Sequence, residues 1–227
     1  MIEQLVPDDV ATAEAFHDPA GPPNAYLYSQ EASVVAAAVD KRQREFTTVR
    51  ICARRALGTL GYPPVPLLPG TRGAPRWPDG VVGSMTHCDS YRAAAVARTD
   101  AVASIGIDAE PNAPLPDGVL DVIALAEERD RLKRLQDDIP EVHWDRLLFS
   151  AKESVFKTWY PLTHRELDFD QARIEVAPAP DAPTTGTFTA HLLIPAPTLN
   201  GHRLHTFTGN WLSHAGLLTT AITVRRT

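Results

Sequence analysis

Two acidic side chains follow an apolar run near the middle of the chain, and their spacing suits metal chemistry. The run ends in Asp108-Ala109-Glu110. Because residues i and i+2 of a strand point to the same face, both carboxylates are expected on one face. Hard divalent cations such as Mg²⁺ prefer oxygen ligands of this kind. Gly106 leaves room for a ligand or for backbone to approach closely. The alternative is an ordinary strand end with solvated acids.

A third acidic residue of interest is Glu153, four residues before Lys157 in a segment with helical periodicity. Glu on the N-terminal side of Lys is the favourable order for a helical ion pair. Both face away from the main apolar stripe, and Glu153 borders a second apolar patch formed by Phe149 and Phe156. A helix that is apolar on two sides is usually buried on two sides, so we expect Glu153 in or beside a cleft. An exposed surface ion pair is the alternative.

Basic side chains crowd one helical segment of an otherwise acidic chain. Residues 41–55 contain six Lys or Arg and one acid. Arg42 lies one turn before Phe46 on the side of the apolar stripe, and Arg50 borders that stripe. Guanidinium groups match phosphate geometry, so we predict an anion site here. A solvated helix face is the alternative.

Two weaker signals follow this segment. Gly70, Thr71 and Arg72 belong to a glycine-rich turn whose backbone N–H groups can face an anion. Thr86 and His87 end a predicted strand, where an imidazole can donate to phosphate. An ordinary turn and a histidine with an internal partner are the alternatives.

A small set of predicted helices and strands must position these residues. Apolar periodicity predicts one helix over about 34–60 and a second over about 142–160, ended by Pro161. A further helical stretch covers 126–136. Strands are predicted over 81–85, 93–97, 103–107, 172–176, 188–194 and 217–224.

A cluster formed by Pro111, Pro114 and Pro116 nearly bisects the chain. Each half then has one dominant helix and several strands. We therefore predict the α+β class, with two halves of similar design packed together, covering residues 1–110 and 111–227.

Composition excludes several classes of protein. The 227 residues are 44% hydrophobic and 22% charged, which is typical of a soluble globular protein. A net charge of −6 argues against a nucleic-acid partner. The acidic N-terminus and the short apolar runs argue against a signal peptide or a membrane partner. Two cysteines, Cys52 and Cys88, fit a reducing cytoplasm, where we expect the protein to act.

Taken in order, these motifs resemble those of the Sfp-type 4′-phosphopantetheinyl transferases. The nearest resemblance is to the actinobacterial branch that serves polyketide, nonribosomal-peptide and fatty-acid carrier proteins. It extends from the Lys41-Arg42 helix to about Ile222. Its most specific parts are Gly106-Ile-Asp-Ala-Glu110 and Ala151-Lys-Glu-Ser-Val-Phe-Lys157, preceded by Gly73-x-Pro75 and Ser84-Met-Thr-His87.

The resemblance implies a fold and an activity. The fold has two pseudo-symmetric α+β halves with the active site between them, and a monomer contains every catalytic residue. The reaction transfers 4′-phosphopantetheine from coenzyme A, the co-substrate, to a serine hydroxyl of an apo acyl or peptidyl carrier protein. It releases 3′,5′-ADP and depends on Mg²⁺, or Mn²⁺ in its place.

The resemblance also implies roles for individual residues. The metal ligands are Asp108, Glu110 and Glu153, with Ala109 joining through its main chain. Glu153 is the proposed general base, and Lys157 lies near the pyrophosphate. The residues expected to bind coenzyme A are Arg42, Arg50, Gly70, Thr71, Arg72, Thr86, His87, Asp108 and Lys157.

The sequence departs from the family pattern at two positions. Phe149 stands where many relatives have Trp, and Pro69 replaces a lysine, so Arg72 must contribute more to binding the nucleotide. Two other functions are alternatives. Paired acids with a Glu and a Lys also suit a Mg²⁺-dependent nuclease or phosphohydrolase, and a non-catalytic module that binds coenzyme A or carrier proteins is the other alternative.

Overall fold

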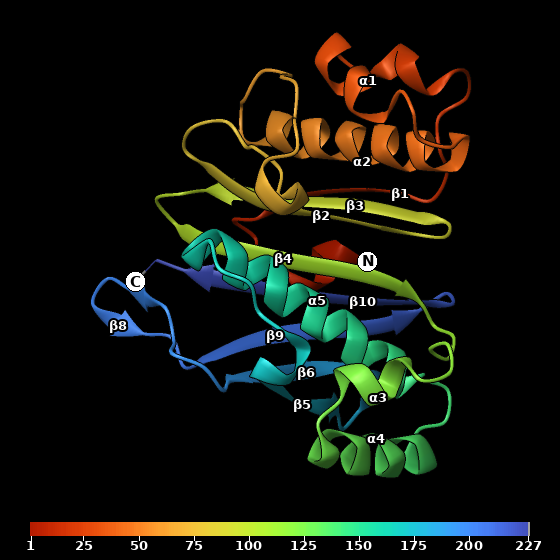
Figure 1. The fold of residues 1–227 in the computed structure, drawn as a ribbon, viewed down its shortest axis with the longest axis vertical. Helices are drawn as coiled ribbons and strands as arrows, with labels where there is room; N and C mark the ends of the chain where they lie inside the picture. Colours follow the sequence, from red (N-terminus) through yellow and green to blue (C-terminus); the bar gives the residue numbers. More distant parts are fainter. Residues whose placement is uncertain (227) are drawn as a thin grey trace.

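Two main antiparallel sheets, each covered by one long helix, lie next to each other in the computed structural model, which describes residues 1–226 (Figure 1). The N-terminal sheet has the order β1-β3-β2. Its strands are β1 (Ala11–Ala15), β2 (Val81–Cys88) and β3 (Tyr91–Arg98). The helices of this part are η1 (Ile2–Leu5), η2 (Pro23–Tyr26), α1 (Ser29–Val35), α2 (Asp40–Thr59) and η3 (Thr71–Gly73).

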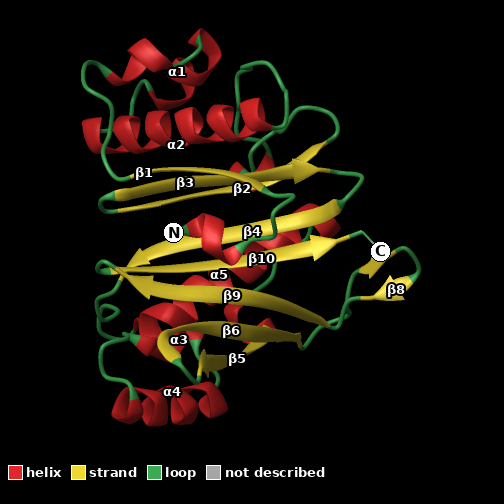
Figure 2. Ribbon diagram, turned by 180° about the vertical axis from the view of Figure 1, so that it is seen from behind, coloured by secondary structure: helices red, strands yellow, loops and turns green. Residues whose placement is uncertain are grey.

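The C-terminal sheet has the order β4-β10-β9-β6-β5. Its strands are β4 (Val102–Pro111), β5 (Ala172–Ala179), β6 (Ala182–Leu192), β9 (Thr206–His214) and β10 (Leu217–Arg225). Helix α5 (Trp144–Thr163) crosses one face, and Figure 2 shows the opposite face, with η1 beside β10. The smaller elements are α3 (Val119–Ile123), α4 (Ala126–Asp138), η4 (Phe169–Gln171), β7 (Thr198–Leu199) and β8 (His202–Arg203).

The apolar stripes predicted for the two long helices form the cores. In α5 the buried stripe is Trp144, Leu147, Leu148, Ala151, Val155 and Trp159, which packs on the five-stranded sheet. In α2 it includes Phe46, Val49, Ala53, Ala56 and Leu57. Each half therefore has one dominant helix on one sheet, which confirms the predicted α+β class with two halves of similar design.

The seam between the halves runs along β2 and β4, and side chains bridge it. The hydroxyl of Ser84 accepts a hydrogen bond from the N–H of Ile107 at 3.1 Å. The hydroxyl of Thr86 accepts one from the N–H of Ala109, also at 3.1 Å. Two side chains of β2 thus bind amides of β4 where a continuous sheet would use backbone carbonyls.

The division of the chain at residues 110 and 111 stays a prediction. In the structure this division falls within β4, between Glu110 and Pro111, and β4 pairs along nearly its whole length with β10. By hydrogen bonding, β4 thus lies with the C-terminal sheet.

Helix α5 lies unusually close to β4 because of Gly106. A Cβ atom at this position would lie 2.0 Å from the carbonyl oxygen of Ser154 and 2.3 Å from the hydroxyl oxygen of Thr158. Of the two possibilities expected from the sequence, a ligand or backbone close to Gly106, the structure shows backbone. This close approach lets α5 lie directly on the strand that bears Asp108 and Glu110.

Both long helices differ from their predicted bounds. The helix predicted over 34–60 is broken, since α1 ends at Val35 and α2 begins at Asp40, after an extended Val39. The second helix does not end at Pro161 but continues to Thr163. Proline removes one backbone N–H and so one helical hydrogen bond, but only Leu162 and Thr163 follow it in the helix.

The predicted strands all lie at least largely within observed ones, whereas β1 and β9 were not predicted. Strand β1 is only partly buried, and in β9 Gly209 takes a buried position between Phe207 and Trp211, so neither sequence shows a strong apolar alternation. Within residues 1–226, no helix is both long and apolar enough to cross a membrane.

The substitution Gly106→Ala tests the close packing of α5 on β4. Because the added methyl meets backbone, we expect a loss of about 1–3 kcal/mol in the free energy of unfolding. Thermal unfolding by calorimetry measures it. The control is Gly58→Ala in α2, where a Cβ meets nothing within 4 Å and φ is not positive. An unchanged melting temperature for Gly106→Ala would contradict the packing argument.

Candidate active site

A cavity of about 360 Å³ opens where β2, β4 and α5 meet. Each of the three elements contributes side chains that the sequence singled out. Its lining consists of Met85, Thr86 and His87 from β2, Asp108 and Glu110 from β4, and Phe149, Glu153 and Lys157 from α5. The structure thus brings six of the predicted site residues together at the seam between the halves.

Asp108 is the most buried carboxylate of the cavity. Its Oδ1 accepts hydrogen bonds from Lys157 Nζ at 2.7 Å and from the Thr86 hydroxyl at 3.2 Å. Lys157 Nζ also donates to the carbonyl of Ile107 at 3.1 Å. The other oxygen of Asp108, Oδ2, is buried and has no hydrogen-bond partner within residues 1–226. Since a buried carboxylate oxygen without a partner is costly, this atom points to a ligand.

Glu110 and Glu153 both have raised pKa values. Burial raises the pKa of Glu110 to about 7, assisted by the charge of Asp108 and opposed by Arg146, whose Nη1 donates to Glu110 at 3.0 Å. Burial also raises the pKa of Glu153, where Lys157 opposes the shift and Asp108 adds to it. The positive charges of the protein therefore do not offset the burial of these two carboxylates.

The donor set suits a hard cation. Asp108, Glu110 and Glu153 offer only carboxylate oxygens to the cavity, and these are the ligands that Mg²⁺ prefers. Within residues 1–226, however, no three His, Cys, Asp or Glu side chains are gathered closely enough to enclose a metal ion. A cation here would need further ligands, such as phosphate oxygens or water. Ala109 is fully buried, and its N–H is used by Thr86.

Arg42 and His87 meet at the N-terminal side of the cavity. Nη1 of Arg42 donates to Nε2 of His87 at 2.7 Å. Burial, together with the charges of Arg42, Lys157 and Arg92, lowers the pKa of His87 to about 4. His87 is therefore neutral and carries its proton on Nδ1, 3.6 Å from Oε2 of Glu45.

Four other predicted residues lie away from this lining. Arg50 is buried and donates from Nε to the carbonyl of Leu67 at 3.0 Å, with its guanidinium over the ring of Phe46. Gly70, Thr71 and Arg72 lie in or beside η3, and Arg72 pairs with Glu166 of the segment after α5 at 2.5 Å. Their contacts with a nucleotide stay predictions.

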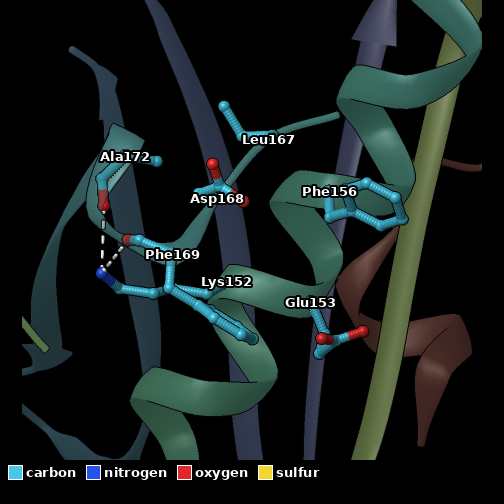
Figure 3. A pocket seen from close by; sticks show the side chains of 7 residues that line it. All are labelled: Lys152, Glu153, Phe156, Leu167, Asp168, Phe169 and Ala172. Carbon is cyan, nitrogen blue, oxygen red and sulfur yellow. Dashed lines mark hydrogen bonds between the residues drawn. The ribbon is translucent and has the colours of Figure 1, made fainter. Parts of the chain in front are cut away.

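A second, smaller cavity of about 210 Å³ adjoins Glu153 on the other side (Figure 3). It is mostly apolar, and Glu153 lines both cavities. The full lining consists of Lys152, Glu153, Phe156, Leu167, Asp168, Phe169 and Ala172.

A buried ion pair holds the wall of this second cavity. Nζ of Lys152 lies 2.8 Å from Glu128 and donates to the carbonyls of Phe169 at 2.7 Å and Ala172 at 3.1 Å (Figure 3). Glu128 also accepts hydrogen bonds from the N–H groups of Leu125 and Ile174. The pair therefore joins α4, α5 and β5.

Three residues with contacts at these cavities were not predicted from the sequence: Glu128, Glu45 and Arg146. Arg146 had a usable signal, since it precedes Glu153 by two helical turns and lies on the same face of α5. Glu128 and Glu45 had none, because their partners come from distant elements.

Comparisons with known proteins agree with this site. A model of the 4′-phosphopantetheinyl transferase N-terminal domain matches residues 30–97, and one of the 4′-phosphopantetheinyl transferase superfamily matches residues 104–204. The chain is 60% identical to 4′-phosphopantetheinyl transferase Svp of Streptomyces mobaraensis, over 99% of this chain and 89% of that protein. It is 48% identical to PptT of Mycobacterium tuberculosis, over 95% and 92%. It is 47% identical to Npt of Nocardia iowensis, over 98% and 99%.

The chain belongs to the 4′-phosphopantetheinyl transferase superfamily. Its similarity to Svp, PptT and Npt places it in the Sfp-type actinobacterial branch, as the motifs predicted. It is an enzyme that transfers phosphopantetheine from coenzyme A to carrier proteins, and neither the nuclease nor the non-catalytic alternative is supported.

The substitution Lys152→Met tests the buried ion pair. It leaves the charge of Glu128 buried and unpaired, so we expect a loss of about 3–5 kcal/mol in the free energy of unfolding. The double variant with Glu128→Gln should lose less than the sum of the two single variants. The matched control is Lys41→Met, which removes the exposed pair with Asp89 and should barely change the melting temperature. Additive losses from the two changes would contradict the coupling.

Proposed function

We propose that the cavity at the seam is where coenzyme A and the serine of an apo acyl or peptidyl carrier domain react, and that Asp108, Glu110 and Glu153 hold Mg²⁺ or Mn²⁺ there. The observation that supports this most is the buried Oδ2 of Asp108, which has no partner within residues 1–226 in a cavity with two further carboxylates. When bound, the cation neutralises the pyrophosphate and serves as a Lewis acid. Ala109 contributes through its carbonyl.

Glu153 is the general base in this proposal. Its raised pKa brings it nearer to neutral pH, which favours a base in proton transfer. It removes the proton of the serine hydroxyl as the serine oxygen bonds to the phosphorus of the phosphopantetheine group. The bond from that phosphorus to 3′,5′-ADP breaks, and the electron pair leaves with the nucleotide.

Lys157 stabilises the charge that grows on the leaving group. Its ammonium is held by Asp108 and the carbonyl of Ile107, so it is already oriented before substrate enters. Pre-oriented cations of this kind cost no reorganisation at the moment of reaction.

Arg42 and His87 bind the 3′-phosphate of coenzyme A, with Thr86 beside them. Arg50 adds positive charge near this site, since it is close enough to Arg42 for the two charges to interact. Gly70, Thr71 and Arg72 flank the adenine and its ribose. The mostly apolar second cavity, which adjoins Glu153, suits the pantetheine arm.

The carrier domain approaches from the side of α3, where Val122 is 76% exposed. An exposed apolar side chain on this segment after β4 agrees with the family's need for a docking surface. Because every side chain of the proposed site belongs to one chain, a monomer in the cytoplasm suffices for the reaction.

The reaction is tested by the intact mass of a generic apo carrier protein after incubation with this enzyme, coenzyme A and Mg²⁺. We expect a gain of one phosphopantetheine that disappears when EDTA removes the metal. The variant Glu153→Gln should give no gain while it still binds coenzyme A in calorimetry, because it keeps the shape but loses the base. A gain that persists in EDTA would refute the metal site, and normal turnover by Glu153→Gln would remove Glu153 from the role of base.

The 3′-phosphate site is tested by Arg42→Gln. Because the variant loses a charged hydrogen bond to the phosphate, KM for coenzyme A should rise about tenfold or more, with kcat little changed. KM for 3′-dephospho-coenzyme A should stay as in the wild type, since that substrate lacks the phosphate. The control is Arg44→Gln on the same helix, whose side chain pairs with Asp40. Equal losses for both substrates would place the 3′-phosphate elsewhere.

A further inference from the structure

We propose that Arg146 is a positioning residue for the metal site, which fixes Glu110 relative to the catalytic helix. The inference rests on the metal site proposed above. It concerns a residue of the first turn of α5 that lies outside the family motifs discussed so far.

The guanidinium of Arg146 has a partner for each of its three nitrogens. Nη1 donates to Oε2 of Glu110 at 3.0 Å. Nε donates to the carbonyl of Ala113 at 3.1 Å, and Nη2 to the carbonyl of Pro114 at 2.7 Å. The side chains of Arg146 and Glu110 are only 17% and 18% exposed. A planar guanidinium held at all three nitrogens has one orientation, so Glu110 has a fixed partner.

This contact gives each acid of β4 its own cation from α5. Lys157 holds Asp108, and Arg146, about three helical turns earlier, holds Glu110. Only one oxygen of Glu110 is used by Arg146, which leaves the other for a cation. Side chains that orient a metal ligand in this way are part of the site, although they never touch the metal.

Arg146 is one of several contacts between the start of α5 and the segment after β4. Asp145 accepts a hydrogen bond from the N–H of Leu115 at 2.8 Å. The side chain of Asn112 accepts one from the N–H of His143 and donates to the carbonyl of Glu141. These contacts keep the segment attached when Arg146 is changed, so its loss should act mainly on Glu110.

The experiment measures Mn²⁺ binding by electron paramagnetic resonance, with coenzyme A present and no carrier protein. Loss of an outer-shell partner typically weakens metal binding at least about tenfold, which is the change we expect in Kd for Arg146→Gln. Arg146→Lys, which keeps the charge but loses the planar fork, should fall between this variant and the wild type. Coenzyme A binding in EDTA should be unchanged in both.

Two controls separate positioning from a general loss of structure. Arg129→Gln removes a different pair of an arginine with a carboxylate, the exposed pair of Arg129 in α4 with Asp121, and should leave Mn²⁺ binding unchanged. In a Glu110→Gln background, Arg146→Gln should weaken Mn²⁺ binding much less than it does in the wild type. The reason is that the side chain that Arg146 positions is already altered.

Each outcome distinguishes this inference from the proposal on which it rests. Wild-type Mn²⁺ affinity in both Arg146 variants would overturn the role of Arg146 and leave the metal site intact. An equally large loss in the Glu110→Gln background would also overturn it. If the wild type itself binds no Mn²⁺ with coenzyme A present, the proposed metal site fails and the inference fails with it.

Discussion

The close contact between α5 and β4 at Gly106 determines where the reactive side chains lie. Helix backbone occupies the space where any other residue would place its Cβ, so the helix lies directly on the strand. At that separation the ammonium of Lys157 reaches Asp108, and Glu153 shares a cavity with Asp108 and Glu110. A small increase in the distance between helix and strand would separate Glu153 from the two acids of β4. The arrangement of the proposed site therefore depends on backbone packing.

The position of the site at the seam follows from how the two sheets meet. Side-chain hydroxyls of Ser84 and Thr86, and not backbone carbonyls, join β2 to β4. The two sheet edges therefore leave room for polar side chains between them. Thr86 both joins the sheets and contacts the site, since its hydroxyl accepts a hydrogen bond from the N–H of Ala109 and donates one to Asp108. Most residues proposed to bind the nucleotide come from the N-terminal half, whereas the acids and the proposed base come from the other sheet and its helix. Neither half contains the proposed site alone.

The sequence allowed much of this to be predicted where the signal was local. The stripe of α5, the shared face of Asp108 and Glu110, and the position of Glu153 beside a cleft all follow from periodicity within one element. The sequence did not reveal contacts that depend on distant elements, such as the pairing of Lys152 with Glu128 or the inward orientation of Arg50. The break before Asp40 and the passage of α5 through Pro161 were also missed, because tertiary packing overrides local preference at helix ends.

The seam has a mechanical consequence. A backbone ladder joins strands with a rigid series of bonds, whereas two hydroxyl bridges and packed side chains join β2 to β4. In the proposed function, coenzyme A held by Arg42 and His87 on one side and by Lys157 on the other would bridge this joint. Substrate binding would then add polar contacts between the two sheets along the line where the backbone supplies few.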